Sequence, residues 1–293
     1  MVEDWLRSAV SFPGMPGLLS FHAHPDDEVI QTGGVLAQAA SEGRPTMVLT
    51  ATDGAEGEIH NYDDPDEIRP RLAEVRAVEV EAALSLLGVD EHAFLGYRDS
   101  GMVGEATNFH PDCFWQADFD DAVGRVIRHI RRLRPDVMTI YDPYGGYGHP
   151  DHIQVHRVGL AAIWAAPDLA RYPLTEGEEP WLVPKVYWST WPRSRRRRFA
   201  EIRLAAGEIT QEEYDAASVS GTPDELLTMV DTGKWVDTKL AALKAHRSQI
   251  PDDWFMLRVD EDMRDEVVGL ESFYRVHTSV AVEDAGDLFT GLD

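Results

Sequence analysis

Short apolar runs alternate with amphipathic segments along the first two thirds of the chain. The runs at residues 18–23 and 46–52 are almost continuously apolar or β-branched, which is typical of parallel strands buried on both faces. Longer segments with apolar residues at helical spacing follow them, as at residues 119–133. The other expected elements are strands at 92–95, 137–141 and 185–191, and helices around 35–41 and at 72–87, 155–166 and 235–246.

This order of elements predicts the fold class. Strands separated by helices need crossover connections, so they lie parallel in one sheet with helices on its faces. We therefore predict an α/β protein, a Rossmann-like three-layer sandwich with a mostly parallel sheet and a smaller C-terminal region. Residues 1–180 are expected to form the catalytic domain, and residues 181–293 a C-terminal region that completes or lids the active site. The ends are expected to be a lead-in at 1–16 and a mixed tail at 259–293, with polar helix or loop at 199–232.

Two similar polar runs follow predicted strands. His24-Pro25-Asp26-Asp27-Glu28 follows the strand at 18–23, and His149-Pro150-Asp151-His152 follows the strand at 137–141. Proline lacks the N–H that a central strand needs, so each strand ends there and the chain turns. Ligands of open α/β sheets bind beyond the carboxyl ends of the strands. If the two strands are neighbours, the two runs can face one ligand.

The residue types in these runs indicate metal-dependent hydrolysis. His24, Asp27 and His152 offer two imidazoles and a carboxylate, which leaves a fourth zinc position open for water. Asp26 is then free to take a proton from that water and return it to a leaving amine. His149 could stabilise charge on the carbonyl oxygen or, when protonated, act as an acid, and Tyr147 could reach the same oxygen from its glycine loop. Zn²⁺ is the expected ion, although Fe²⁺ also suits these donors.

Two other ligand sets compete with this one. His22 and His24 form a His-x-His pair as in metal-dependent barrel hydrolases, but eight strand–helix repeats are not apparent. His152 and His156 are four apart on a predicted helix, but no glutamate follows His152 as in a zinc-protease helix. The remaining histidines have no partner spacing and are taken as ordinary: His60, His92, His110, His129, His246 and His277.

Composition narrows the possible partners. The 293 residues carry 27 Lys+Arg against 52 Asp+Glu, a formal charge of −25, which repels nucleic acid and anionic lipid. The arginine run at 193–198 stands alone without aromatic residues, so we expect a solvated loop or pairing with the acidic surface. The single cysteine, Cys113, excludes an intramolecular disulfide and any multi-cysteine metal site. No apolar run could span a bilayer and the start lacks the features of a secretory signal, so a cytoplasmic protein is expected.

The two runs, with Ala23 before the first, resemble the LmbE-like or PIG-L superfamily of zinc-dependent de-N-acetylases. The resemblance covers about residues 17–166. It is closest to the mycothiol group, which comprises the N-acetylglucosaminyl-inositol deacetylase and the mycothiol conjugate amidase. It implies zinc ligands at His24, Asp27 and His152, a base at Asp26, and transition-state stabilisation by His149 and Tyr147. It also implies that Arg76 and Asp99 hold sugar hydroxyls, with Glu56 as a further candidate.

The resemblance predicts removal of an N-acetyl group from a small amino sugar, best represented by N-acetylglucosaminyl-inositol. Residues 243–250, followed by Phe255, look more like the conjugate amidase branch, so cleavage of a mycothiol conjugate is an alternative. Deacetylation in antibiotic assembly is another. A catalytically silent metal or sugar-binding relative would have no reason to keep Asp26. A nucleotide-binding protein of this fold would need a glycine-rich phosphate loop that the chain lacks. The oligomeric state is left open.

Overall fold

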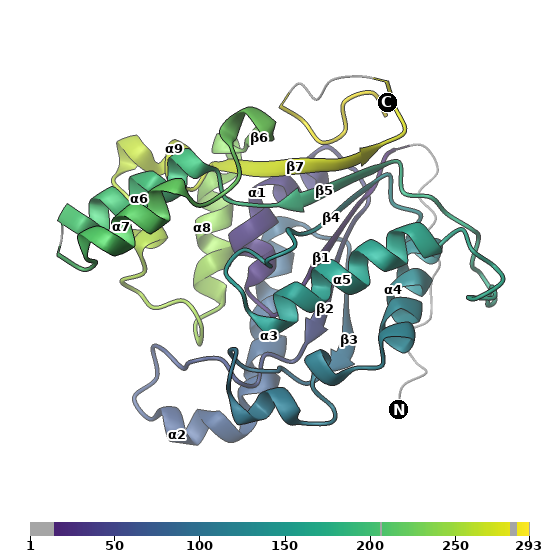
Figure 1. Ribbon diagram of the computed structural model, residues 1–293, viewed down its shortest axis with the longest axis horizontal. Helices are drawn as coiled ribbons and strands as arrows, with labels where there is room; N and C mark the ends of the chain where they lie inside the picture. Colours follow the sequence, from purple (N-terminus) through teal and green to yellow (C-terminus); the bar gives the residue numbers. More distant parts are fainter. Residues whose placement is uncertain (1–14, 206, 282–285, 293) are drawn as a thin grey trace.

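The computed structural model describes residues 15–205, 207–281 and 286–292, so most of the predicted lead-in at 1–16 lies outside the described residues. Within them, one seven-stranded sheet has the order β3-β2-β1-β4-β5-β7-β6 (Figure 1). β1 to β5 pair in parallel, β7 pairs antiparallel with β5, and β6 pairs antiparallel with β7. The strands are β1 Leu18–His22, β2 Thr46–Thr52, β3 Glu91–Tyr97, β4 Val137–Tyr141, β5 Lys185–Ser189, β6 Leu227–Asp231 and β7 Leu270–Thr278.

Helices cover both faces of the sheet and make three layers. α4 and α5 contribute to one apolar cluster, and α1, α3 and α8 contribute to the other. The α-helices of the described residues are α1 Asp27–Ser41, α2 Pro65–Ile68, α3 Leu72–Leu87, α4 Phe119–Leu133, α5 Pro150–Ala165, α6 Arg193–Ala205, α7 Gln211–Val219, α8 Val236–Ala245 and α9 Arg264–Val267. Short 3₁₀ segments are Arg69–Arg71, Ala106–Phe109, Phe114–Gln116, Asp224–Leu226, Gly233–Trp235, Phe255–Arg258 and Glu261–Met263.

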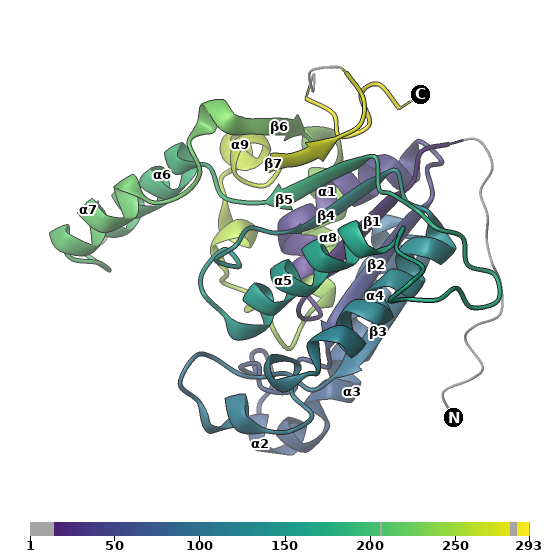
Figure 2. The same cartoon turned by 45° about the vertical axis from the view of Figure 1, so that its right-hand side comes forward.

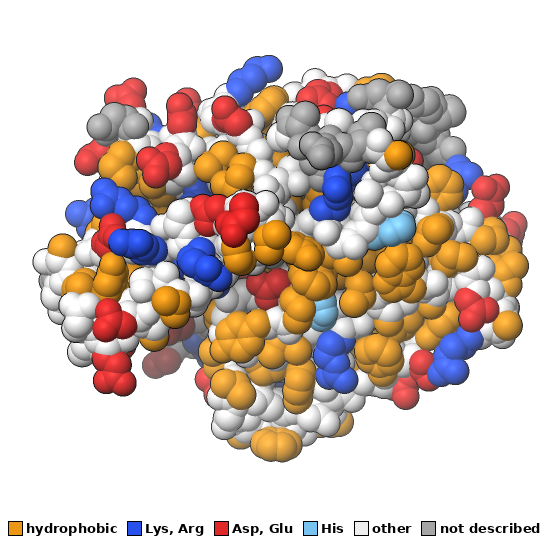
Figure 3. Space-filling model, turned by 45° about the horizontal axis from the view of Figure 1, so that its top comes forward, with side chains coloured by type: hydrophobic (Ala, Val, Ile, Leu, Met, Phe, Trp, Pro, Cys, Tyr) orange, Lys and Arg blue, Asp and Glu red, His pale blue; other side chains and the backbone are white. Residues whose placement is uncertain are grey.

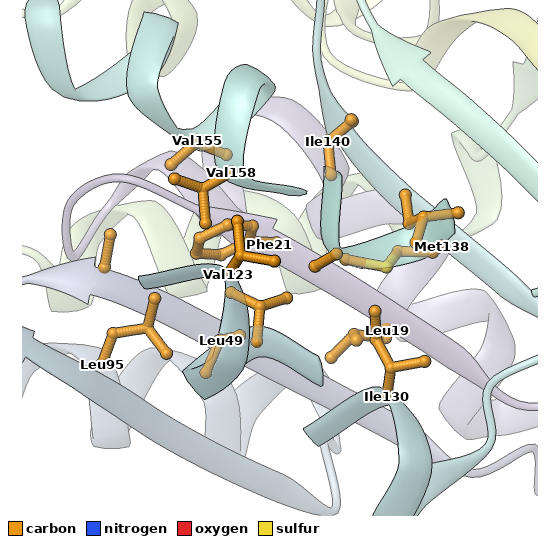
Figure 4. Close-up of a cluster of buried hydrophobic side chains, with 14 of the residues drawn as sticks. Leu19, Phe21, Leu49, Leu95, Val123, Ile130, Met138, Ile140, Val155 and Val158 are labelled. Carbon is orange, nitrogen blue, oxygen red and sulfur yellow. The ribbon is translucent and has the colours of Figure 1, made fainter. Parts of the chain in front are cut away.

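The alternation of side chains along β1 supplies both halves of the core. Leu18 joins the cluster under α1 and α3, whereas Leu19 and Phe21 join the cluster under α4 and α5. Figure 4 shows Phe21 close to Val158. Each of these strand side chains is 0% exposed, and burial of a leucine or phenylalanine contributes about 1.5–3 kcal/mol. The near-continuous apolar pattern of β1 predicts burial on both faces, and both faces are buried.

The strand order places a topological switch point between β1 and β4. From β1 the chain moves outward through β2 to β3, and it then returns to pair β4 with the other edge of β1. The loops that leave β1 and β4 therefore diverge, and ligands of open α/β sheets bind at such a point. The run at His24 begins two residues after β1, and the run at His149 follows β4 after a loop over residues 142–148.

The predicted fold class is confirmed, and the differences lie mainly after residue 190. The chain beyond residue 180 adds β5, β7 and β6 to the same sheet, so it extends the core; the division at residue 180 stays a prediction. Two of these strands, β6 and β7, were not predicted. The helix expected around 35–41 begins earlier, at Asp27, where its acidic first turn suits the positive end of the helix dipole.

The arginine run forms the start of helix α6, so the prediction of a loop was wrong. Arginine is a good helix former, and Glu201 lies within 3.1 Å of Arg197 and 3.6 Å of Arg198, at helical spacing. Figure 3 shows basic and acidic side chains interspersed on the side where α6 lies. α6 and α7 contact each other and project from the body (Figure 2).

Candidate active site

The first run is held in a strained turn. Asp26 has φ 127°, a conformation that costs a residue with a side chain about 1–3 kcal/mol and persists only where its surroundings enforce it. Its carbonyl accepts hydrogen bonds from the N–H groups of Val29 and Ile30, both at 3.1 Å, which begins α1. Its own N–H donates to Oε2 of Glu28 at 2.9 Å. Strained residues cluster at functional sites, so the backbone angle supports the predicted role of Asp26 by a criterion independent of its spacing.

The second run forms the start of α5. His149 is the N-cap, and its Nδ1 accepts a hydrogen bond from the N–H of Asp151 at 3.1 Å. His152 then lies in the first turn, with its ring stacked on Tyr141 at 4.4 Å between centroids. The preceding loop passes so close that a Cβ on Gly145, which has φ +63°, would lie 2.5 Å from Cβ of His152. Glycine is required there by both the close approach and the backbone angle.

Three donor atoms from the two runs form a nearly equilateral triangle. Nδ1 of His24 lies 3.4 Å from Oδ2 of Asp27, and Nε2 of His152 lies 3.3 Å from each of these atoms. A tetrahedral zinc ion with ligand bonds of about 2.0–2.1 Å separates its ligand atoms by about 3.3–3.4 Å. All three residues are buried. The donor set and its spacing fit a divalent metal ion with one position open.

The charges in this triangle favour a metal ligand set. Burial acts to raise the pKa of Asp27, but His152 and His24 outweigh it and hold that pKa well below its usual range. Asp27 is therefore an ionised carboxylate. Two imidazole nitrogens that face each other at 3.3 Å can share only one proton. A cation between them satisfies both lone pairs.

The other ring nitrogen of His24 is held by carboxylates. Its Nε2 lies 3.3 Å from Oδ2 of Asp151 and 3.5 Å from Oδ1 of Asp99. Asp151 is itself bound by Ser100, whose N–H donates to Oδ2 at 2.9 Å and whose hydroxyl donates to Oδ1. A carboxylate at the second nitrogen fixes the tautomer that presents the Nδ1 lone pair to a metal.

A second group of ligand atoms is also compact. His24, Asp99, His149 and Asp151 place one ligand atom each within 4.8 Å of one another, as do His24, His149 and His152. The first of these groups surrounds Nε2 of His24, where Asp151 already has two protein donors. The triangle with Asp27 has the more regular spacing, so we favour it as the metal site.

The contact between Asp151 and His24 gives a first prediction. We expect Asp151→Asn to weaken metal binding about 10–100-fold, because a neutral amide supports the ring less than a carboxylate does. The dissociation constant of the metal can be measured by competition with a chelating dye. Asp168→Asn, at an exposed position, is the matched control and should bind as the wild type does. Unchanged affinity in Asp151→Asn would show that the ring needs no such support.

Asp26 lies beside the triangle, and its carboxylate contacts Arg76. Nη2 of Arg76 is 3.2 Å from Oδ2 of Asp26, and the same side chain donates to the carbonyls of Pro25 and Gly54 at 2.5 and 2.7 Å. Burial raises the pKa of Asp26 to about 6; Arg76 opposes the rise and Asp27 adds to it. A carboxylate with this pKa is ionised at neutral pH and remains basic enough to accept a proton.

The raised pKa predicts the pH dependence of turnover. Below its pKa of about 6, Asp26 holds a proton and cannot accept one from water, so kcat should fall with decreasing pH. The fall in kcat should approach about tenfold per pH unit, and a bound cation shifts the pH range of this fall downward. Arg76→Met removes a positive charge beside Asp26, so the fall in kcat should begin at higher pH. The measurement is kcat from about pH 4 to about pH 8, and a flat profile contradicts the assignment of Asp26.

His149 and Tyr147 lie next to the two histidines of the triangle. The rings of His149 and His24 are 4.5 Å apart between centroids, and the hydroxyl of Tyr147 is 3.4 Å from Nε2 of His152. Burial, helped by the neighbouring His24 and His152, lowers the pKa of His149 to about 3. The protonated form considered from the sequence is therefore disfavoured. Because Nδ1 accepts the Asp151 N–H, the ring proton lies on Nε2, so His149 is a neutral hydrogen-bond donor.

The three predicted sugar ligands all have protein partners. Arg76 is 2% exposed and contacts Asp26, as described above. Asp99 accepts hydrogen bonds from the N–H groups of Gly101 and Glu56 at 2.9 and 3.2 Å. The carboxylate of Glu56 pairs with Arg98. Contact between these residues and a sugar stays a prediction, and the structure adds that Arg76 and Asp99 also hold Asp26 and His24.

Two residues near the site had no role in the sequence analysis, Asp151 and Glu28. Asp151 supports His24, and its place between two histidines of one run was the available signal. Glu28 binds the N–H of Asp26 and pairs with His246, one of the histidines that have no partner spacing in the sequence. No spacing rule could have linked two residues 218 positions apart.

Comparison with known proteins agrees with this geometry. The PIG-L family, described as GlcNAc-PI de-N-acetylase, matches residues 19–163, the part that contains both runs. A 1D-myo-inositol 2-acetamido-2-deoxy-alpha-D-glucopyranoside deacetylase from Thermobispora bispora is 42% identical over 274 residues, which cover 87% of this chain and 86% of that protein. The chain belongs to the PIG-L family.

Solved structures share the fold of this PIG-L family member. An N,N'-diacetylchitobiose deacetylase from Pyrococcus horikoshii superposes with a TM-score of 0.62 at 22% identity, over 89% of this chain and 84% of that one. A 4-carboxy-2-hydroxymuconate hydratase from Pseudomonas putida has a TM-score of 0.59 at 20% identity, over 92% and 99%. These likenesses support the α/β architecture, and they leave the reaction to be argued from the site. Among the described helices, none has the length and apolar character needed to cross a bilayer.

Proposed function

We propose that this PIG-L family member is a zinc-dependent deacetylase that removes the N-acetyl group of 1D-myo-inositol 2-acetamido-2-deoxy-α-D-glucopyranoside. The relative that shares 42% of its residues carries the name of this activity. The observation that carries the chemistry is the triangle of His24, Asp27 and His152 with Asp26 beside it. The substrate is a small, neutral amino sugar, which suits an acidic chain.

The metal site would supply Lewis-acid chemistry. His24, Asp27 and His152 would hold a zinc ion, which when bound polarises the acetamide carbonyl and makes water more acidic. Asp26 accepts a proton from the water as the oxygen of that water forms a bond to the carbonyl carbon. The buried guanidinium of Arg76 holds that carboxylate in place. The same Asp26 then gives the proton to the sugar nitrogen as the C–N bond breaks, which yields acetate and a free amine.

His149 and Tyr147 would stabilise the charge that develops on the carbonyl oxygen. Both are hydrogen-bond donors, since the imidazole of His149 has its proton on Nε2 and burial raises the pKa of the Tyr147 hydroxyl. Preorganised donors of this kind act at the transition state and cost no reorganisation there. Arg98 and Glu56 pair beside Asp99, where a sugar hydroxyl could replace part of their contact.

A panel of substrates tests the proposed activity. Acetate release should be measured for the inositol glycoside, for plain N-acetylglucosamine and for a mycothiol conjugate, each with zinc-loaded and with chelator-treated protein. We expect release from the inositol glycoside that the chelator abolishes. Cleavage of the conjugate alone would place the chain in the amidase branch instead. Turnover that survives chelation would remove the metal from the proposal.

A further inference from the structure

A histidine from the far end of the chain lies beneath the first run. His246 follows α8 and is 0% exposed, and its Nε2 contacts Oε1 of Glu28 at 2.7 Å. Glu28 is also 0% exposed, and its other oxygen accepts the N–H of Asp26 at 2.9 Å. An imidazole, a carboxylate and a backbone amide therefore form one continuous path from His246 to the strained residue.

The segment that carries His246 is fixed independently of this path. Two residues further on, Ser248 donates its N–H and its hydroxyl to the two oxygens of Glu79 at 2.8 and 2.6 Å. Glu79 lies on α3 one turn after Arg76, the residue that contacts the carboxylate of Asp26. The carbonyl of Ser248 also accepts the N–H of His60 at 2.8 Å. His246 is therefore anchored to the same helix that holds Asp26 from its other side.

The strain at Asp26 explains why such an anchor is needed. At φ 127° the residue stays in place only if its N–H and its carboxylate are both held. Arg76 holds the carboxylate, and Glu28 holds the N–H. Without His246, the Glu28 side chain could rotate toward another donor, because a buried carboxylate is costly unless both of its oxygens are hydrogen-bonded. His246 occupies its second oxygen and so fixes the orientation of the first.

We propose that His246 is a positioning residue for the base Asp26, acting through Glu28. The inference rests on the proposed function, since it assigns His246 to the same reaction. The competing explanation is a buried pair that contributes only to stability. α8 offers a matched pair for comparison: Lys239 contacts Glu271 at 2.5 Å with both side chains 3% exposed, and Glu271 binds the middle of α1, at Gly34 and Val35.

Three variants separate the two explanations. His246→Leu removes the donor at similar volume, His246→Gln keeps an amide N–H near the position of Nε2, and Lys239→Met breaks the matched pair. We expect kcat of the zinc-loaded enzyme to fall about 10–100-fold in His246→Leu with KM and metal content unchanged. His246→Gln should restore kcat. Lys239→Met should lower the melting temperature at least as much, because it leaves a buried carboxylate unpaired, yet keep its kcat.

Crystal structures of the wild type and of His246→Leu give a readout that does not depend on turnover. We expect Asp26 in the variant to leave φ 127° or to lose its hydrogen bond to Glu28. Three results would overturn the proposal: an unchanged Asp26, a fall in kcat no larger than in Lys239→Met, or an effect confined to KM. If the wild type released acetate from none of the substrates, the proposed function would fail, while the two structures would still decide whether His246 positions Asp26.

Discussion

Asp26→Asn should lower kcat for deacetylation about 10²–10⁴-fold and leave the bound metal in place, because positioned general bases contribute rate factors of this size. The amide keeps the shape of the side chain and an oxygen for Arg76, but it cannot take a proton from water. The carboxylate oxygens of Asp26 are outside the triangle of donor atoms, so the metal keeps its three ligands in the variant. Single-turnover acetate release and metal content should be measured on the same preparation.

The control for this substitution is a carboxylate that takes no part in the site. Asp252 is exposed, and Asp252→Asn should turn over as the wild type does. Normal turnover in Asp26→Asn would remove the base assignment and, with it, the reason for the strained backbone. Loss of metal in Asp26→Asn would show instead that this carboxylate is a ligand.

His152→Ala should lose both metal and turnover. The substitution leaves two of the three donor atoms, and the loss in affinity should exceed the roughly 10–100-fold that follows from removing a supporting residue. Metal content after dialysis and the dissociation constant from dye competition give the result directly. Added zinc at high concentration should restore little activity, because the remaining carboxylate and imidazole cannot close the coordination shell.

A second histidine on the same helix provides the control. His156 is also buried, with Nδ1 2.9 Å from the carbonyl oxygen of Tyr141, and it lies outside the compact groups of ligand atoms. His156→Ala should keep its metal even if it lowers stability. Equal loss of metal in both variants would contradict the triangle and favour the alternative in which His152 and His156 form a ligand pair.

The parallel half of the fold could be predicted because its signals are local. The buried strands β1 and β4 have apolar side chains on both faces, and Pro25 follows the end of β1 closely. The second proline, Pro150, instead begins helix α5, because β4 already ends at Tyr141. β7 could not be predicted in the same way. It carries Glu271 at a buried position, where Lys239 from α8 and the N–H groups of Gly34 and Val35 from α1 satisfy the carboxylate. A pattern of apolar and polar residues does not show which charges have a partner.

The candidate site divides in a similar way. His24, Asp27 and His152 could be proposed from the sequence because residue type and spacing limit how metal ligands are arranged. The residues behind them could not. Glu28 and His246 meet only after the whole sheet has formed, and Arg76 was expected to face a sugar before the structure placed it against Asp26. Supporting contacts depend on the tertiary fold, so no motif reveals them.

The fold alone leaves the reaction open. A hydratase superposes on this chain about as well as a sugar deacetylase does, with TM-scores of 0.59 and 0.62. The proposed reaction is therefore supported by the donor triangle, by Asp26 beside it and by relatives that share about two fifths of the sequence. The positions of these few side chains, more than the architecture, carry the proposal.

Anomalous diffraction at the zinc edge, from crystals of the zinc-loaded protein, tests the metal site most directly. We predict one strong peak at about 2.0–2.2 Å from Nδ1 of His24, an oxygen of Asp27 and Nε2 of His152. The carboxylate of Asp26 should lie beside the ion without binding it. A peak against Asp99, His149 and Asp151 instead, or no peak between the two runs, would contradict the proposed centre and the mechanism built on it.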